Sequence, residues 1–277
     1  MLTTLDERGR VAGFIEFLYL LFSSIIFVFI RNQSLHIVAV FNIFISLIIL
    51  FFESSYFKKR PEPDPSEHTK FERKTIIFYL IPWIAFSLIN ATTAKIISLQ
   101  ASKYIIPLFS YLMIVIGAIG ALVGGAISDF TGRKIPLAFA LTLYGISSVF
   151  SAFVEVYILV NFMFIITGLT WGIISTLYLF VVWGDLADKK TYQYTYSIGL
   201  ATFFAISGLG LLLTPEILKV SLFIASITNC LIIFISNIFI FLAPEILPSD
   251  VREKNYFKLY IYLIKRRKHS LRVDLTN

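Results

Sequence analysis

Eight apolar segments of membrane-spanning length constrain what this chain can fold into. An α-helix needs roughly 20 mostly apolar residues to cross the hydrocarbon core of a bilayer. Segments of this kind cover residues 11–30, 35–52, 75–97, 104–128, 135–153, 156–184, 195–213 and 220–243, with short polar gaps between them. The segment 35–52 is slightly short, and we pair it with 11–30 as a helical hairpin. The predicted fold class is therefore an all-α, polytopic helical membrane protein with eight transmembrane helices.

The composition of the chain supports the same class. Hydrophobic residues make up 57% of the sequence, the mean hydropathy is +0.82, and charged residues make up only 15%. Soluble domains usually contain roughly 25% charged residues. The single cysteine, Cys230, lies in an apolar run, so an intramolecular disulfide is excluded. The partner that this composition predicts is the lipid bilayer.

Lysine and arginine are distributed unevenly between the polar gaps. If the N-terminus lies in the cytoplasm, 20 of the 24 basic residues fall in cytoplasmic segments. The four on the outer side are Arg31, Lys95, Lys103 and Lys219. An excess of basic residues in cytoplasmic loops sets the orientation of a membrane protein. We therefore expect a multi-pass protein of the plasma membrane with both termini in the cytoplasm. The net charge of +7 then reflects topology, and no nucleic-acid partner is predicted.

The most specific pattern of the chain is a short polar sequence at the end of the 104–128 segment. It reads Gly125-Ala126-Ile127-Ser128-Asp129-Phe130-Thr131-Gly132-Arg133-Lys134. The order of glycine, aspartate, glycine, arginine and lysine resembles motif A, the signature loop of major facilitator superfamily transporters, with the pattern G-x-L-a-D-r-x-G-r-k. Every fixed position is met, and only Ile127, Ser128 and Phe130 replace softer ones. The resemblance implies a solute transporter built from two six-helix halves.

A polar linker at 53–74 divides the predicted helices into two and six. It is rich in proline and charge, which makes it too polar to bury. In the family a long cytoplasmic loop joins the two halves, and this linker resembles it. We therefore expect four regions: an N-terminal helical hairpin at 1–52, the linker at 53–74, a six-helix facilitator half at 75–243, and a basic cytoplasmic tail at 244–277.

The region before the linker also resembles a part of the family fold. The turn at 7–13 resembles the one that precedes the fifth helix of a facilitator half, and 188–199 is the equivalent turn of the second half. Two predicted spans and an acidic residue follow each turn, which is a weak internal repeat. This order implies helices five to twelve of a twelve-helix transporter, with the first four absent. The alternative is an unrelated hairpin added to a six-helix unit.

The resemblance also implies a role for the motif A residues Gly125, Asp129, Gly132, Arg133 and Lys134. Asp129 lies just before the helix that Pro136 opens, and its carboxylate is expected to face a helix N-terminus, where the helix dipole favours negative charge. Arg133 is expected to reach an acidic residue at the end of the half's fourth helix, and Asp185 is at that place. Such a cluster would latch the cytoplasmic side shut. The alternative is a static loop whose charges only set topology.

Polar and aromatic side chains recur at helical spacing within several predicted spans. The candidate solute cavity consists of Glu16, Trp83, Asn90, Thr167, Trp171 and Ser175. Hydroxyls and aromatic rings can bind a small polar solute, but ordinary helix packing explains the same stripes. For Glu16 the favoured interpretation is a solvated carboxylate near the cytoplasmic interface, and the alternative is a coupling or solute-facing carboxylate. For the other residues the two interpretations stay open.

Glycines in the 104–128 segment form a small-residue face. Gly120 and Gly124 have the small-x-x-x-small spacing, and Gly117 and Gly125 extend it. Small residues let two helices approach closely without any ligand. The sequence therefore predicts a close helix contact on this face.

Two classes of function agree with these patterns. The first is a secondary transporter that moves a small-molecule solute by alternating access. The second is a non-transporting membrane protein, either a truncated relative or a subunit whose partner supplies the missing helices. No metal site is expected, because the three histidines lie far apart, and no cofactor or enzymatic site is expected either.

Overall fold

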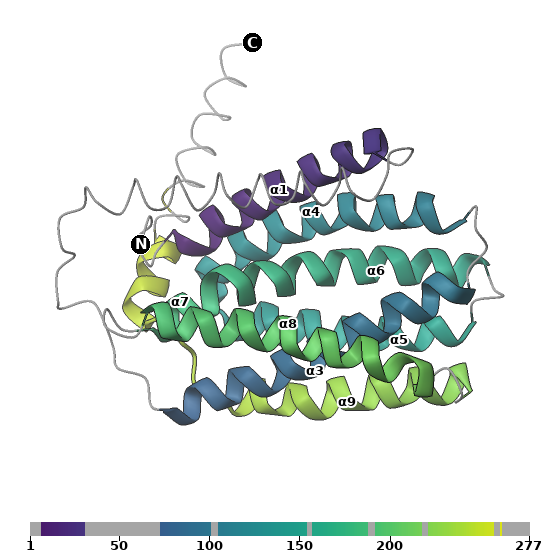
Figure 1. Cartoon of the computed structure of the whole chain (residues 1–277). Coiled ribbons are helices and arrows are strands. Elements are labelled where there is room, and N and C mark those ends of the chain that lie inside the picture. Colours follow the sequence, from purple (N-terminus) through teal and green to yellow (C-terminus); the bar gives the residue numbers. More distant parts are fainter. Residues whose placement is uncertain are drawn as a thin grey trace, which may run out of the picture.

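The structure, a computed structural model, describes residues 7–30, 73–100, 105–153, 157–187, 192–217, 221–257 and 261. These residues are almost entirely helical and contain no strand (Figure 1). The helices are α1 (Arg8–Ile30), α3 (Arg73–Gln100), α4 (Ile105–Thr131), α5 (Lys134–Phe150), α6 (Tyr157–Ser175), α7 (Trp183–Leu186), α8 (Tyr192–Ile217) and α9 (Leu222–Leu242). A 3₁₀ turn, η2 (Ser151–Phe153), extends α5, and a π-helix, η3 (Thr176–Val182), joins α6 to α7. A short helical segment at 249–257 follows α9.

Five helices in the described ranges are long and apolar enough to cross a membrane. They cover Arg73–Thr92, Leu112–Thr131, Lys134–Phe153, Ile158–Leu186 and Phe223–Leu242. The all-helical membrane fold expected from the sequence is confirmed. The predicted spans 11–30 and 195–213 are helical as α1 and α8, although these two helices are not among the five. The predicted span 35–52 and the linker 53–72 lie outside the described residues.

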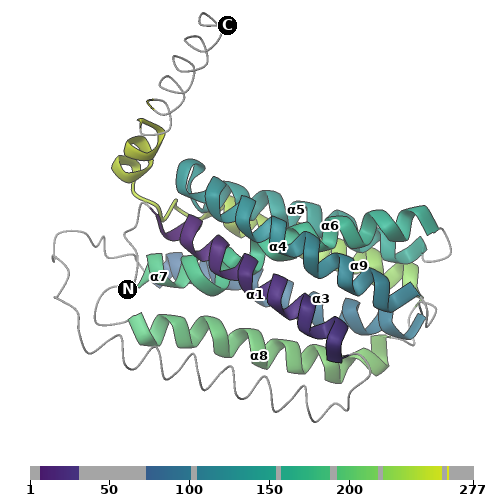
Figure 2. The ribbon, with the colours of Figure 1, turned by 90° about the horizontal axis from the view of Figure 1, so that it is seen from above.

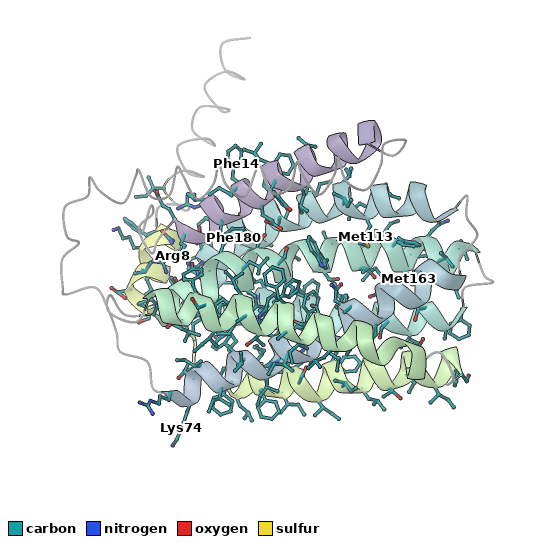
Figure 3. The ribbon with its side chains drawn as sticks, in the orientation of Figure 1. Arg8, Phe14, Lys74, Met113, Met163 and Phe180 are labelled. Atoms are coloured by element: carbon teal, nitrogen blue, oxygen red, sulfur yellow. The ribbon has the colours of Figure 1, made fainter. Side chains whose placement is uncertain are left out.

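Six of the helices pack as a continuous series of neighbours. α4 packs on α6, α6 on α5, α5 on α9, α9 on α3, and α3 on α8. α1 comes from the other side of the linker in sequence, and it lies along α4 and also contacts η3 (Figures 1 and 2). Its Phe14 points away from the bundle and is 54% exposed (Figure 3). Exposed apolar side chains of this kind suit a surface that faces lipid.

Glycines explain why α4 approaches two helices closely. On one face, a Cβ atom at Gly120 would collide with the carbonyl of Leu169 on α6, and a Cβ at Gly124 would lie 2.8 Å from Ile173. On the other face, a Cβ at Gly125 would collide with the carbonyl of Gly9 on α1. The predicted close helix contact is present, and it involves two helices rather than one.

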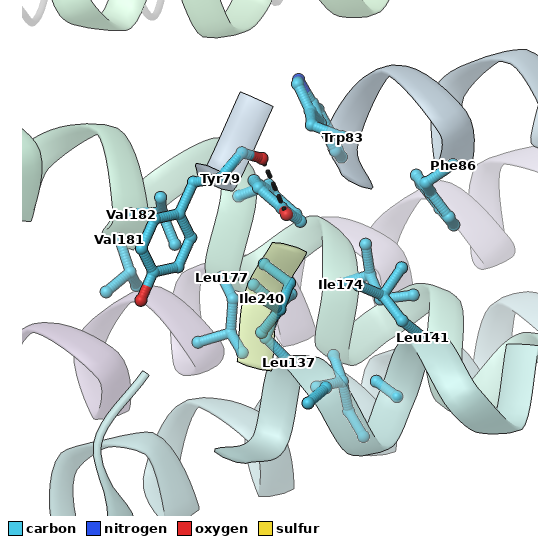
Figure 4. Close-up of a cluster of buried hydrophobic side chains, with 14 of the residues drawn as sticks. Tyr79, Trp83, Phe86, Leu137, Leu141, Ile174, Leu177, Val181, Val182 and Ile240 are labelled. Carbon is cyan, nitrogen blue, oxygen red and sulfur yellow. Dashed lines mark hydrogen bonds between the residues drawn. The ribbon is translucent and has the colours of Figure 1, made fainter. Parts of the chain in front are cut away.

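A cluster of large side chains forms the core between α3, α5, η3 and α9 (Figure 4). Trp83 is fully buried there and stacks on Phe86, Tyr178 and Phe203, with ring centroids 4.5–5.7 Å apart. Its indole N–H donates to the carbonyl of Gly199 on α8 at 2.9 Å. Buried indoles usually find such a partner. The core therefore fastens α3 to both η3 and α8.

Candidate functional site

Charged side chains gather where α1 begins, α4 ends and α7 lies, at one end of the bundle (Figures 1 and 3). We call this set the charge cluster: Arg8, Arg10, Asp129, Arg133 and Asp185. Four of its five side chains are almost completely buried, and Arg10 is 41% exposed. Buried charges persist only when they are paired and hydrogen-bonded. Each buried charge of the cluster therefore needs a partner of opposite charge.

Asp129 holds the first turn of α1. One carboxylate oxygen accepts the backbone N–H of Gly9 at 2.8 Å, and the other accepts the backbone N–H of Arg10 at 2.8 Å. The first N–H groups of a helix have no partner within the helix, and the dipole favours an anion beside them. Asp129 thus faces a helix N-terminus, and that N-terminus belongs to α1 and not to the helix that Pro136 opens.

Arg133 joins the two acidic residues of the cluster. Its Nη1 lies 2.7 Å from Asp129 and 3.0 Å from the Ser128 hydroxyl, and its Nε lies 2.8 Å from Asp185. Burial alone would lower the pKa of Arg133, but the carboxylates of Asp185 and Asp129 raise that pKa above its ordinary value. The guanidinium therefore stays charged although it is fully buried.

Arg8 completes the cluster from α1. Its guanidinium forms a buried ion pair with Asp185, the same residue that binds Arg133. Arg10 binds Asp129 through its Nε at 3.1 Å and lies over the ring of Phe130. The order of contacts is arginine, aspartate, arginine, aspartate, arginine, so every carboxylate lies between two guanidinium groups.

The turn between α4 and α5 needs a glycine at position 132. Gly132 has a φ of +92°, which L-residues with a side chain rarely adopt. A Cβ there would also collide with the carboxylate of Glu245. That carboxylate accepts the backbone N–H groups of Arg133 at 2.8 Å and Lys134 at 3.1 Å, so it caps the start of α5.

Lys134, at the start of α5, in turn binds the end of α9. Its Nζ donates to the carbonyls of Phe241 at 2.6 Å and Ala243 at 2.9 Å. A basic side chain is favourable at a helix C-terminus, where carbonyls lack partners. Asn255, in the 249–257 segment, donates to the backbone carbonyl of Asp129 at 3.0 Å. The motif A turn is therefore fixed from α1, α9 and the segment that follows α9.

The π-helix η3 places Asp185. Seven residues with wide turns shift the register of everything that follows them, and π-segments are often found at functional sites. The Tyr196 hydroxyl donates to the Phe180 carbonyl at 2.7 Å. The Tyr178 hydroxyl donates to the Tyr79 carbonyl at 3.0 Å, and Figure 4 marks this bond with a dashed line. These two tyrosines tie η3 to α8 and α3, so Asp185 enters the cluster from a rigid support.

The expected members Gly125, Asp129, Gly132, Arg133, Lys134 and Asp185 all lie at this end of the bundle. Sequence reasoning missed other contributors, among them Arg8, Arg10, Glu245 and Asn255. The sequence predicts Arg8 and Arg10 as cytoplasmic charges in the 7–13 turn and Glu245 as the acidic residue after the last span, without a place for them in the latch. A signal was present, because Arg8 and Arg10 flank a glycine at the start of a predicted helix.

The residues of the predicted solute cavity each have contacts within the bundle. Trp83 is a core residue, as described above. The Thr167 hydroxyl donates to Ser147 at 3.1 Å, and Asn90 accepts the Tyr144 hydroxyl at 3.4 Å, so both side chains bind α5. Trp171 is half-buried and packs against the core. In this conformation these contacts fit the helix-packing interpretation.

Glu16 and Ser175 form a separate pair. The Ser175 hydroxyl lies 3.2 Å from a carboxylate oxygen of Glu16, and Glu16 is only 2% exposed. The interpretation of Glu16 as a solvated interfacial carboxylate is therefore wrong. The cause is the glycine-lined contact of α1 with α4, which brings the buried stripe of α1 out of contact with water.

No group of three or more histidine, cysteine, aspartate or glutamate side chains in the described ranges could hold a metal ion.

The chain was compared with protein families, curated proteins and solved structures. The family described as "Sugar (and other) transporter" matches residues 38–182, just over half of the chain. This range contains Asp129 and Arg133 and ends three residues before Asp185. Neither the curated proteins nor the solved structures contained a match.

Proposed function

The chain belongs to the sugar (and other) transporter family of the major facilitator superfamily, and on that premise we propose that it is a secondary transporter. It carries a small solute, a sugar first among the classes to test, across the plasma membrane by alternating access. The charge cluster acts as the latch of its cytoplasmic side. The single observation that carries this proposal is the chain of ion pairs in which Arg8 and Arg10 of α1 bind Asp185 and Asp129, and Arg133 joins these two carboxylates.

Ion pairs of this kind are suited to a two-state contact. Bringing charges out of water costs about as much as their mutual attraction returns, so a buried ion pair adds little net stability. When α1 separates from α4 and α7, water solvates Arg8, Asp129 and Asp185 again. The closed and open arrangements can therefore lie close in free energy, which alternating access requires. A hydrophobic contact of the same area would favour the closed state permanently.

The latch joins parts of the chain that lie on opposite sides of the 53–74 linker. α1 precedes the linker, and α4, α5 and α7 follow it. The closed state has every cluster carboxylate between two cations, and rocking of α1 away from α4 breaks the contacts of Asp129 with Gly9 and Arg10. Transport then follows from relative motion of α1 and the 75–243 bundle around a solute held between them.

Purified protein in proteoliposomes provides the test of transport. We expect saturable uptake of a radiolabelled sugar or other small solute, and counterflow when the vesicles are preloaded with the unlabelled solute. Counterflow requires a carrier that alternates between two faces, so it separates a transporter from a leak. Absence of both binding and uptake over a panel of sugars, organic acids and amine cations would instead support the non-transporting alternative.

The orientation of the protein is a second prediction. Cysteines introduced as Ser66→Cys in the linker and Ser270→Cys in the tail, in a Cys230→Ser background, are expected to resist an impermeant thiol reagent in intact cells. Permeabilised cells should label both. Ser102→Cys, in an outer gap, is the matched control and should be labelled from outside. External labelling of position 66 or 270 would contradict a cytoplasmic placement of the latch.

A further inference from the structure

A buried carboxylate on α1 lies outside the charge cluster. Glu16 belongs to the buried stripe of α1, together with Gly13 and Leu20. A Cβ at Gly13 would lie 2.5 Å from the carbonyl of Ala121 on α4, and Leu20 approaches the position of Gly117. Glu16 therefore faces the seam where α1 meets α4 and the end of α6, between the close backbone contact at Gly13 and the side-chain contact of Leu20.

The surroundings of Glu16 offer no compensating cation in the described ranges. Between Gly117 and Gly125, α4 carries only apolar residues and glycine. Its ionisable residues are Asp129 and Tyr111, and Asp129 binds the first turn of α1. The one ionisable residue of η3, Tyr178, donates to the carbonyl of Tyr79.

The cations of α1 itself are also committed elsewhere. Arg10 is six residues from Glu16, about 9 Å along the helix axis, and its guanidinium binds Asp129. Arg8 is farther away and pairs with Asp185. Glu7, the acidic residue directly before α1, is exposed. An ionised Glu16 would thus be a buried charge supported by a single hydroxyl.

The hydrogen count at Ser175 indicates which form Glu16 takes. The Ser175 oxygen lies 3.2 Å from a Glu16 oxygen and 3.2 Å from the carbonyl oxygen of Gly172. A serine hydroxyl has one hydrogen to donate and can also accept. If Glu16 is ionised, the Ser175 hydroxyl has one hydrogen for two acceptors, the Glu16 carboxylate and the Gly172 carbonyl, and the carboxylate gains at most this one hydrogen bond from it. If Glu16 carries a proton, its O–H donates to Ser175 while Ser175 donates to Gly172, and all three groups are satisfied.

We propose that Glu16 is a proton-binding site whose neutral form holds α1 against Ser175 at the end of α6, and whose ionisation releases α1 from the bundle. A neutral acid can remain in the apolar seam, whereas a carboxylate is stabilised by water that only separation of α1 admits. The charge cluster and Glu16 then both hold α1 in the closed state, and both contacts break when α1 separates from the bundle. This step rests on the proposed function, because it assigns the separation of α1 to the opening of the cytoplasmic side.

Infrared spectroscopy of the whole protein tests the proton directly. At neutral pH the wild type should show the C=O band of a carboxylic acid, and Glu16→Gln should lose it. Glu253→Gln makes the same chemical change at an exposed site and should keep the band. Ser175→Ala, which removes the hydrogen-bond partner, should shift the frequency of the band and the pH at which it disappears. A spectrum without a band that depends on Glu16 overturns the proposal.

Spin labels test the release of α1. Labels at Glu7, directly before α1, and at Ile135 on α5, both exposed, report the separation of α1 from the bundle. In the wild type the distance distribution should shift to longer values at alkaline pH, over the range in which the infrared band disappears. Glu16→Gln mimics the protonated acid and should keep the short distance at every pH. A pH-dependent shift that persists in Glu16→Gln, or its absence in the wild type, overturns the release.

The two proposals can fail separately. Neither the infrared band nor the spin-label distance depends on a transported solute. A protein without uptake or counterflow that still shows the Glu16-dependent band and distance change retains the proton site and loses the transporter function. A protein that transports but lacks the band retains the function and loses the proton site.

Discussion

Asp129→Asn is expected to reduce solute uptake by at least about tenfold, which corresponds to roughly 1.4 kcal/mol. The carboxylate of Asp129 accepts hydrogen bonds on both oxygens: from the Gly9 N–H and Arg133 on one, and from the Arg10 N–H and its Nε on the other. An asparagine has one oxygen and one NH₂ group. Whichever way the amide is turned, its NH₂ group meets donors, and the negative charge between Arg10 and Arg133 is lost.

Asp129→Asn is expected to destabilise the closed state rather than the open one. Removing one partner of a buried ion pair costs about 3–5 kcal/mol, because the other charge stays buried without compensation. In the open state the same residues are solvated, so the substitution costs little there. The closed cytoplasmic side becomes rare, and the transport cycle slows. Solute binding should be retained, because Asp129 belongs to the latch rather than to a solute site.

Controls decide whether the effect comes from the latch. Asp250→Asn makes the same substitution at an exposed position near the same end of the molecule, and it should leave uptake unchanged. Expression and solute binding of Asp129→Asn are measured alongside uptake. Equal uptake by the wild type and Asp129→Asn would contradict the latch mechanism.

Gly172→Ala is expected to lower the melting temperature of the protein. An extra methyl group in a well-packed contact typically lowers the free energy of unfolding by about 1–3 kcal/mol. A Cβ at Gly172 on α6 would collide with the carbonyl of Gly117 and lie 2.8 Å from the backbone nitrogen of Ala121 on α4. Both contacts are with backbone atoms, which cannot turn aside as a flexible side chain can. The α4–α6 contact has to open to admit one methyl group.

Gly208→Ala is the matched control for this change. Gly208 lies within α8, and a Cβ there would have no atom within 4 Å. Alanine favours a helix over glycine by roughly 1 kcal/mol, so this variant should melt at or slightly above the wild-type temperature. The measurement is the melting temperature of each purified protein in the same detergent. Equal melting temperatures for Gly172→Ala and the wild type would show that the α4–α6 contact is not close-packed.

Several features of the protein could be predicted from local sequence. Long apolar segments become helices because a helix satisfies its backbone hydrogen bonds without water, which a bilayer requires. The glycine spacing of Gly117, Gly120 and Gly124 predicted a close contact for the same kind of local reason, since only small residues admit a neighbouring backbone. Motif A is likewise a continuous sequence, and its glycine at 132 occupies a turn with φ of +92°.

Other features depend on groups that meet only in the folded protein. The Asp129 contact with Gly9 spans 120 residues, the Glu245 cap on Arg133 spans 112, and the Arg8 pair with Asp185 spans 177. The sequence by itself determined the helices, the membrane class and the charged turn. Only the tertiary structure decided which helix N-terminus Asp129 binds, because that choice depends on how closely glycines let α1 approach α4. The burial of Glu16 follows from the same approach.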